Sequence, residues 1–196
     1  AEPKSNLASM GIYIFTYEVL KKYLEADERD PSSANDFGKN IIPTMLENGE
    51  KMVSFRFEGY WKDVGTIHSL WEANMDLLNK NNALDLNDSS WKIYTEDVTA
   101  LPQFIGADAD IDRAFITQGC VINGTVKNSV LFTGAKVAAG AKVIDSVLMP
   151  GVEVAEGAVV TRALVADKVK IGKNAVVGSA DSENIELVAK RVKGEE

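Results

Sequence analysis

The second half of the chain repeats itself every seventeen residues. From about residue 110, branched aliphatic residues recur at steps of six, six and five, which fits neither the 3.6-residue period of a helix nor the alternation of a strand. Successive repeats therefore place these residues in three columns. The columns are Val126, Val143, Val160 and Val177; Val137, Val154 and Ile171; and Leu131, Leu148 and Val165.

Small residues stand two positions before most of these aliphatic residues, with Val152 and Val169 as exceptions. This pattern is typical of a coil of three short strands joined by tight corners, in which each strand turns one aliphatic side chain inward. Stacked coils of this kind form a parallel β-helix. A sandwich of short strands is the alternative, but column alignment over more than three repeats favours the β-helix. The small residues are Gly124, Ser129, Ala135, Ala141, Ser146, Ala158, Ala163 and Ala175.

Residues 1–80 have a different pattern, in which apolar runs alternate with helical periodicity. Residues 9–15 are typical of a buried strand, and residues 52–57 alternate like a strand. A helix is predicted to start at Thr16, and a second over residues 37–46 is predicted to be kinked or split by Pro43. Thr66 is a plausible N-cap for a third helix. Two or three strands cannot complete a parallel sheet, so we expect further sheet outside this sequence.

These patterns divide the chain into three parts. We expect an α/β portion over residues 1–80, a connector over 81–104 in which 91–94 could be a strand, and the β-helix over 105–196.

The charge and cysteine content exclude several classes of protein. Lys and Arg number 21 against 29 Asp and Glu, giving a net charge of -8, so nucleic acid and anionic membranes are not expected partners. Cys120 is the sole cysteine, which excludes an internal disulfide and a thiolate zinc cluster and suits a reducing cytoplasm. It falls on an inward position, as a small buried hydrophobe. Neither a signal peptide nor an apolar run of membrane-spanning length is evident.

Three segments in order carry a resemblance to a known family. Residues 7–15 (LASMGIYIF), 36–43 (DFGKNIIP) and 60–66 (YWKDVGT), followed by the repeat, resemble bacterial glucose-1-phosphate adenylyltransferase. The resemblance spans nearly all of this chain but only the later part of the family's length. It implies a Rossmann-like nucleotidyltransferase portion, a left-handed hexapeptide-repeat β-helix and the cytoplasmic, tetrameric organisation of that family. The family's glycine-rich ATP loop and its Glu-Lys pair are not in this sequence, so we expect the chain alone to be inactive.

The resemblance also implies a reaction and two site residues. The family transfers an adenylyl group from ATP to glucose 1-phosphate, giving ADP-glucose for glycogen and pyrophosphate, with Mg²⁺ to neutralise phosphate charge. The matching Asp is a magnesium ligand, which implies that role for Asp63; an Asp that bonds its own turn is the alternative. The matching Ser contacts glucose 1-phosphate, which implies that role for Ser9; a hydroxyl bonded to nearby backbone is the alternative. Tyr13 and Trp61 could line the sugar pocket, but aromatic residues in such apolar runs are usually buried, so both are predicted to be core residues.

Other functions stay open. A noncatalytic regulatory subunit, an oligomerisation module, or a nucleotidyltransferase with another sugar or base would share most of these features. Acyl transfer by the β-helix is disfavoured, because His68 is the only histidine and lies outside residues 105–196. Basic residues near the end could bind an anionic regulator, but a solvated charged face is the preferred interpretation. They are Lys168, Lys170, Lys173, Lys190, Arg191 and Lys193.

Overall fold

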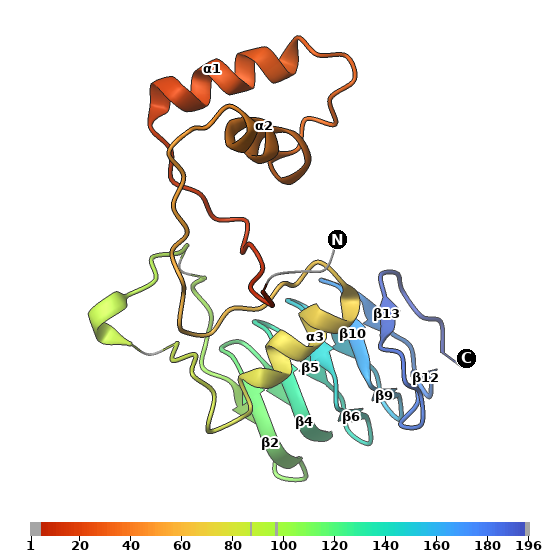
Figure 1. Ribbon diagram of the computed structural model, residues 1–196. Coiled ribbons are helices and arrows are strands. Elements are labelled where there is room, and N and C mark those ends of the chain that lie inside the picture. The colour runs from red at the N-terminus through yellow and green to blue at the C-terminus, as the bar shows by residue number, and fades with distance from the viewer. Residues whose placement is uncertain (1–4, 87, 97, 195–196) are drawn as a thin grey trace. The chain divides into compact units, whose positions relative to one another are not determined.

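The computed structural model describes residues 5–86, 88–96 and 98–194 (Figure 1). The chain forms two compact units, which divide between Phe57 and Glu58. Each unit is described by itself.

The first unit is built on helices. Helix α1 spans Tyr17–Glu28 after an extended Thr16, a π-helical turn η1 spans Phe37–Ile41, and α2 spans Ile42–Glu47. Pro43 lies in the first turn of α2, where a missing N–H costs no hydrogen bond. The predicted split of the second helix is therefore confirmed. The core of the unit is Tyr23, Ile41 and Met45, with Phe15 and Val19 packed against it.

The two strands predicted in this part of the chain do not form. Within the described residues, neither 9–15 nor 52–57 forms a strand or joins a sheet. Ile14, Val53 and Phe55 are 99%, 88% and 89% exposed. A strand forms only beside another strand that hydrogen-bonds its backbone, and no strand of the described part of the chain pairs with these runs. Residues 91–94 likewise form no strand, and Trp91 ends the 3₁₀ turn η2, Ser89–Trp91.

The second unit opens with helix α3, Ile67–Asp76. Its N-terminus carries a capping box: the Thr66 hydroxyl accepts the Ser69 N–H at 3.1 Å, and the Ser69 hydroxyl accepts the Thr66 N–H at 3.2 Å. Two of the four N–H groups that lack helical partners are thereby satisfied. The N-cap predicted at Thr66 is confirmed.

The strands of the second unit, from β1 to β13, form a parallel β-helix (Figure 1). One sheet has the order β1-β3-β5-β8-β11. The second has the order β12-β9-β6-β4-β7-β10-β13, with β2 paired to β4, and bends within β4, which belongs to two faces. The strands are β1 Phe104–Ile105, β2 Asp110–Ile116, β3 Val121–Ile122, β4 Thr125–Leu131, β5 Lys136–Val137, β6 Lys142–Ile144, β7 Val147–Leu148, β8 Glu153–Val154, β9 Val159–Thr161, β10 Ala163–Val165, β11 Lys170–Ile171, β12 Val176–Val177 and β13 Glu186–Val188.

The strand register stacks all three predicted columns. Each column member pairs with the residue one coil further on, and the side chains form one continuous buried core. The small residues that precede them are buried too. At Gly124 a Cβ would lie 2.5 Å from the carbonyl oxygens of Ala138 and Ala141, so only glycine fits. The pairs are Val126↔Val143, Val143↔Val160 and Val160↔Val177; Val137↔Val154 and Val154↔Ile171; and Leu131↔Leu148 and Leu148↔Val165.

The period changes at both ends of the solenoid. Ile105 pairs with Ile122 at the full seventeen-residue spacing, but Ile122 pairs with Val137, which is fifteen residues further on. The turn between β3 and β4 is therefore two residues shorter than in the repeat. Val165 pairs with Val188, because the segment after β12 forms a longer loop before β13. The strands next to each change still pair in parallel, so the two missing residues and the extra residues lie in the turns between strands.

One corner of the β-helix is built from non-glycine residues in the left-handed conformation. Arg113, Asn128, Asp145 and Arg162 occupy equivalent places in successive coils, with φ between 44° and 48°. Asn and Asp tolerate this conformation at small cost, whereas Arg does not favour it.

The outer surface of one face is apolar and is covered by α3. Val130, Val147 and Leu164 point outward from β4, β7 and β10 and pack with Leu70 and Trp71 of the helix. Figure 1 shows α3 lying along this face. Helix α3 lies within residues 1–80, which the sequence assigned to the α/β portion, but it packs in the same compact unit as the β-helix.

Candidate functional site

Ser9 lies in the first unit, in a turn closed by its own hydroxyl. The Gly11 N–H donates to Ser9 Oγ at 3.1 Å, and Ser9 Oγ lies 3.0 Å from the Tyr13 hydroxyl. Gly11 has φ 72°, which a glycine adopts without strain. The hydrogen bond to nearby backbone that was the alternative role for Ser9 is therefore present. The exposed Ser9 hydroxyl can still bind a ligand, either through its second lone pair, if it donates to Tyr13, or through its proton, if it accepts from Tyr13.

A cavity of about 640 Å³ lies next to this turn. The rings of Tyr13 and Phe37 stack at its wall, with centroids 5.9 Å apart and planes inclined by 21°, and Phe15 lies 5.9 Å from each. Tyr13 is 38% exposed, so the prediction that it is a core residue is wrong. Aromatic walls with a few polar groups suit a small polar ligand. The lining residues are Gly11, Tyr13, Phe15, Leu20, Asn35, Asp36, Phe37 and Gly38.

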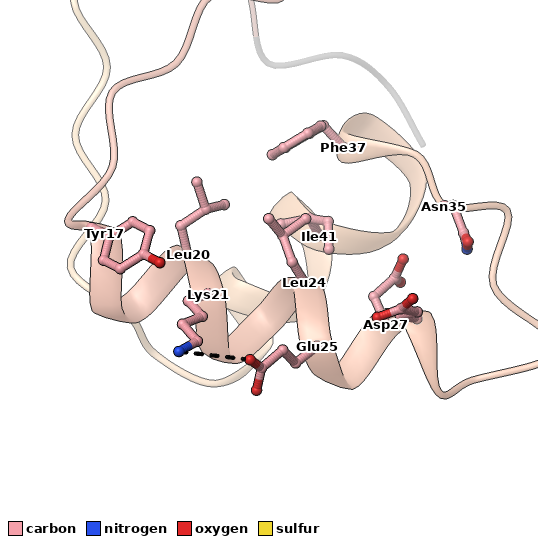
Figure 2. A pocket seen from close by; sticks show the side chains of 10 residues that line it. Tyr17, Leu20, Lys21, Leu24, Glu25, Asp27, Asn35, Phe37 and Ile41 are labelled. Carbon is pink, nitrogen blue, oxygen red and sulfur yellow. Dashed lines mark ion pairs between the residues drawn. The ribbon is translucent and has the colours of Figure 1, made fainter.

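A second cavity, of about 410 Å³, adjoins α1 in the same unit. Figure 2 shows Leu20, Leu24 and Ile41 at its apolar floor, with Lys21 and Glu25 paired along the helix. Phe37 lines both cavities. The cavity beside Ser9 is the better candidate for a ligand of this family, because its wall includes Tyr13, whose hydroxyl lies next to the predicted site residue Ser9.

Asp63 lies in the second unit, immediately before α3. Its Oδ1 accepts the Gly65 N–H at 2.8 Å, the turn-closing bond considered as the alternative reading. A Cβ on Gly65 would lie 3.0 Å from that oxygen, so the bond depends on the glycine. The side chain is exposed and keeps its second oxygen for a ligand. Trp61, predicted to be core, is 46% exposed, and that prediction is also wrong.

The segment that carries Asp63 is held to α3 by a polar cluster. Lys62 Nζ lies 3.1 Å from Asp76 Oδ2 and 3.2 Å from Glu72 Oε2, and the Tyr60 hydroxyl donates to Asp76 Oδ2 at 2.9 Å. Partial burial disfavours the charged form of Lys62, but its bonds to the two carboxylates outweigh this and raise its pKa. Burial and the bond to Asp76 raise the pKa of Tyr60.

Sequence analysis missed this cluster. Glu72 and Asp76 stand four residues apart on a helix, which places them on one face, but that spacing is common on exposed helices. Nothing in the sequence says that Lys62 and Tyr60 fold back onto that face.

A single carboxylate fits one part of a magnesium site. Mg²⁺ is usually held by one or two carboxylates together with phosphate oxygens and water. Among the described residues no group of three His, Cys, Asp or Glu side chains could hold a metal ion. Ser9 and Asp63 belong to different compact units, so each is placed only within its own unit.

Two other candidates, the basic residues near the end of the chain and Cys120, have structural explanations. Lys170 lies 2.8 Å from Glu153, and Lys173 lies 2.9 Å from Glu156, which supports a solvated charged face at the basic end of the chain. Cys120 is fully buried; its thiol donates to the Phe132 carbonyl at 3.2 Å, and burial raises its pKa, which confirms its prediction as a small core residue. Across the residues that the structure covers, no helix has the length and apolar character of a membrane span.

Two family models match successive parts of the chain. "Nucleotidyl transferase" matches residues 1–80, and "GlmU-like, C-terminal hexapeptide" matches residues 103–193. The second match falls on the β-helix, which is thereby a hexapeptide-repeat β-helix, as expected.

Three curated relatives of high identity share one name. The chain is 59% identical over 143 residues to glucose-1-phosphate adenylyltransferase of Clostridium perfringens, covering 73% of this chain and 37% of that protein. It is 54% identical to the enzyme of that name from Bacillus cytotoxicus and 55% identical to that from Bacillus cereus, each over 73% of this chain and 38% of the relative. The chain therefore spans less than two fifths of the length of these relatives.

The order of the two matched domains, the stacked seventeen-residue repeat and the level of identity agree with one another. The chain belongs to the glucose-1-phosphate adenylyltransferase family and corresponds to a portion of its members that joins nucleotidyltransferase sequence to the hexapeptide β-helix.

Proposed function

We propose that the protein containing this chain transfers an adenylyl group from ATP to glucose 1-phosphate, releasing pyrophosphate and forming ADP-glucose. The observation that carries the proposal is the 54–59% identity to relatives with that name over most of this chain. The aromatic cavity beside the Ser9 hydroxyl supports it, because a sugar ring packs well on aromatic faces while its polar groups need hydrogen-bonding partners.

The Ser9 turn positions the sugar phosphate in this proposal. Gly11 N–H and the Tyr13 hydroxyl fix the Ser9 side chain in one orientation, so little conformational entropy is lost when a phosphate or sugar hydroxyl binds it. The stacked rings of Tyr13 and Phe37 form the wall against which the sugar lies. Holding the attacking phosphate oxygen in line with the α-phosphorus of ATP is the main catalytic task of such a site.

Asp63 contributes one carboxylate to divalent metal binding, and we propose Mg²⁺ as the metal. The metal would neutralise charge on the phosphates as pyrophosphate leaves. The Gly65 N–H holds one oxygen of Asp63 and orients the other outward. An anionic carboxylate alone would repel the phosphates, so its role requires the cation.

Variants of a full-length enzyme carrying this sequence test the proposal. Asp63→Asn should lower kcat by about 10²-fold or more, since charge stabilisation at the phosphates is lost. Ser9→Ala should mainly raise the KM for glucose 1-phosphate. Full activity of Asp63→Asn would instead favour a noncatalytic regulatory subunit, and turnover of another sugar phosphate or nucleotide in a substrate panel would revise the specificity.

We also propose that the protein self-associates through the β-helix and acts in the cytoplasm. Both ends of a solenoid leave strand edges that need covering, and Phe104 and Phe115 at the opening coil are 59% and 40% exposed. The single buried thiol of Cys120 suits a reducing compartment. Sedimentation velocity at high protein concentration should show an oligomer, with a tetramer expected for the full-length enzyme; a monomer throughout would contradict this.

A further inference from the structure

The β-helix and the Asp63 segment are connected by an unbroken series of contacts through α3. The indole Nε1 of Trp71 donates to the Asp145 carbonyl oxygen at 2.9 Å, across 74 residues of sequence. The Arg162 guanidinium lies 5.6 Å from the centre of the Trp71 ring, as a cation–π contact. Arg113 Nε donates to the Leu78 carbonyl oxygen at 3.4 Å, just beyond the helix.

All three contacts use the same corner of the solenoid. Arg113, Asp145 and Arg162 are three of the four left-handed residues at this corner, and each contacts α3 or the residues just after it. The Val130, Val147 and Leu164 ladder supplies the apolar floor beneath it. The position of α3 along the solenoid is thus fixed at its middle and at its end.

The opposite side of α3 holds the Asp63 segment. Lys62 bridges Glu72 and Asp76, and Tyr60 bonds Asp76, so the residues on either side of Trp61 are tied to the helix. Glu72 adjoins Trp71 in sequence and sits one turn before Asp76. A shift or rotation of α3 on the solenoid would therefore carry the Asp63 carboxylate with it.

We propose that Lys62 and Trp71 are positioning residues for Asp63, and that the corner of the β-helix sets where this carboxylate presents its free oxygen. The inference rests on the proposed function, in which Asp63 contributes to divalent metal binding. It gives the β-helix a role in the reaction besides assembly: a change in the solenoid at Arg162 alters metal dependence without touching the substrates. Outer groups that hold a metal ligand commonly change metal affinity by about 10–100-fold when lost.

The variants are Lys62→Met, Trp71→Phe and Arg162→Asn, with Lys168→Asn as the matched control. Asn keeps the left-handed corner at residue 162, so only the guanidinium is lost. Lys168 is also a cationic residue in the left-handed conformation, with φ 56°, in the turn after β10. Trp71→Phe removes the N–H donor and keeps an aromatic ring on the apolar face.

The first readout needs neither metal nor substrate. Hydrogen–deuterium exchange of residues 58–66 in the chain itself should accelerate in Lys62→Met, Trp71→Phe and Arg162→Asn, and stay unchanged in Lys168→Asn. The second readout is kinetic, in a full-length enzyme: the half-saturating Mg²⁺ concentration should rise about tenfold in Lys62→Met. Trp71→Phe and Arg162→Asn should raise it less, with an unchanged KM for glucose 1-phosphate in all three.

The outcomes separate this inference from the proposed function. If Asp63→Asn abolishes turnover while Lys62→Met and Trp71→Phe leave exchange and Mg²⁺ dependence unchanged, the positioning role is wrong and the proposed function stands. If Asp63→Asn retains full activity, both fall. Should Trp71→Phe unfold the protein, Lys62→Met decides, because its partly exposed side chain bonds only surface carboxylates of α3.

Discussion

Trp71 Nε1 and the backbone oxygen of Asp145 are joined by a hydrogen bond of 2.9 Å, which fastens a helix to the corner of a solenoid 74 residues away in sequence. The Asp145 carbonyl thus finds its hydrogen-bond donor on α3 and not on a neighbouring coil of the β-helix. Because the donor lies on the helix that follows the Asp63 turn, this pair links the candidate metal ligand to the β-helix.

Replacing Trp71 with Phe should destabilise the second unit. The Asp145 carbonyl would lose its partner while remaining partly covered by the ring, at a cost of about 1–3 kcal/mol. Urea unfolding followed by circular dichroism would measure the change. An unchanged midpoint would show that water replaces the indole at no cost.

Ser146→Ala should break a buried hydroxyl ladder. Ser146 Oγ accepts the Ala163 N–H at 3.1 Å and donates to the Ile144 carbonyl at 2.7 Å, and Ser129 Oγ accepts the Ser146 N–H in the same way. Without the hydroxyl the Ala163 N–H has no acceptor, so we expect a loss of about 1–3 kcal/mol in unfolding free energy. Exposed Ser89→Ala is the control, and equal effects of the two substitutions would contradict the ladder's role.

Val143→Ala tests the stacked columns. Val143 is fully buried between Val126 and Val160, so truncation removes two methyl groups and leaves a cavity. The free energy of unfolding is expected to fall by about 2–3 kcal/mol, between the usual cost of Ile→Val and the upper cost of Leu→Ala in a protein core. Val176→Ala, at a strand position that is 73% exposed, should change the unfolding free energy little under the same conditions.

Gly65→Ala should disturb the Asp63 turn without straining the backbone. The added methyl group would lie 3.0 Å from Asp63 Oδ1, so the carboxylate must move by a few tenths of an ångström and weaken its bond to the residue 65 N–H. In a full-length enzyme the half-saturating Mg²⁺ concentration should rise by about tenfold. Gly49→Ala would be a poor control because φ there is 72°; Ser54→Ala, at an exposed site, serves instead.

Glu153→Gln should reveal a small pH-dependent contribution on the outer face of the β-helix. Bonds from Lys170 and Lys136 lower the pKa of Glu153 below its ordinary value of 4.5. A lowered folded-state pKa means that the carboxylate's stabilisation is complete above about pH 4.5 and disappears as pH falls through the lower folded value. Because the groups are exposed, the wild type should exceed the variant by only about 0.5 kcal/mol at neutral pH. The difference should vanish near pH 2 and shrink in high salt; a gap that grew in acid would have the wrong sign.

The β-helix was predictable because its information is local and periodic. Each coil repeats the same inward positions, so the columns at Val126, Val137 and Leu131 follow from counting. The register in the structure adds only the shorter turn between β3 and β4 and the longer last coil. Helix boundaries were predictable for a similar reason, since the Thr66 cap and Pro43 act on the turns in which they lie.

Strands in the first part of the chain were not predictable in the same way. An apolar run such as residues 9–15 specifies that it favours an extended backbone, but pairing depends on a neighbour elsewhere, and no neighbour lies within the described residues. Tyr13 and Trp61 were misjudged as core for this reason, because burial of an aromatic ring depends on what packs against it.

Local spacing in the chain specifies the repeating solenoid, its inward columns, the helix caps and the motif positions of Ser9 and Asp63, since each depends on neighbours a few residues or one coil away. Long-range packing is needed to place α3 on the β-helix through Trp71 and Asp145, to fold Lys62 back onto Glu72 and Asp76, and to put Tyr13 at the wall of a cavity. Those relationships join surfaces far apart in the chain, and the free energy that selects them comes from three-dimensional packing and desolvation, which no local spacing encodes.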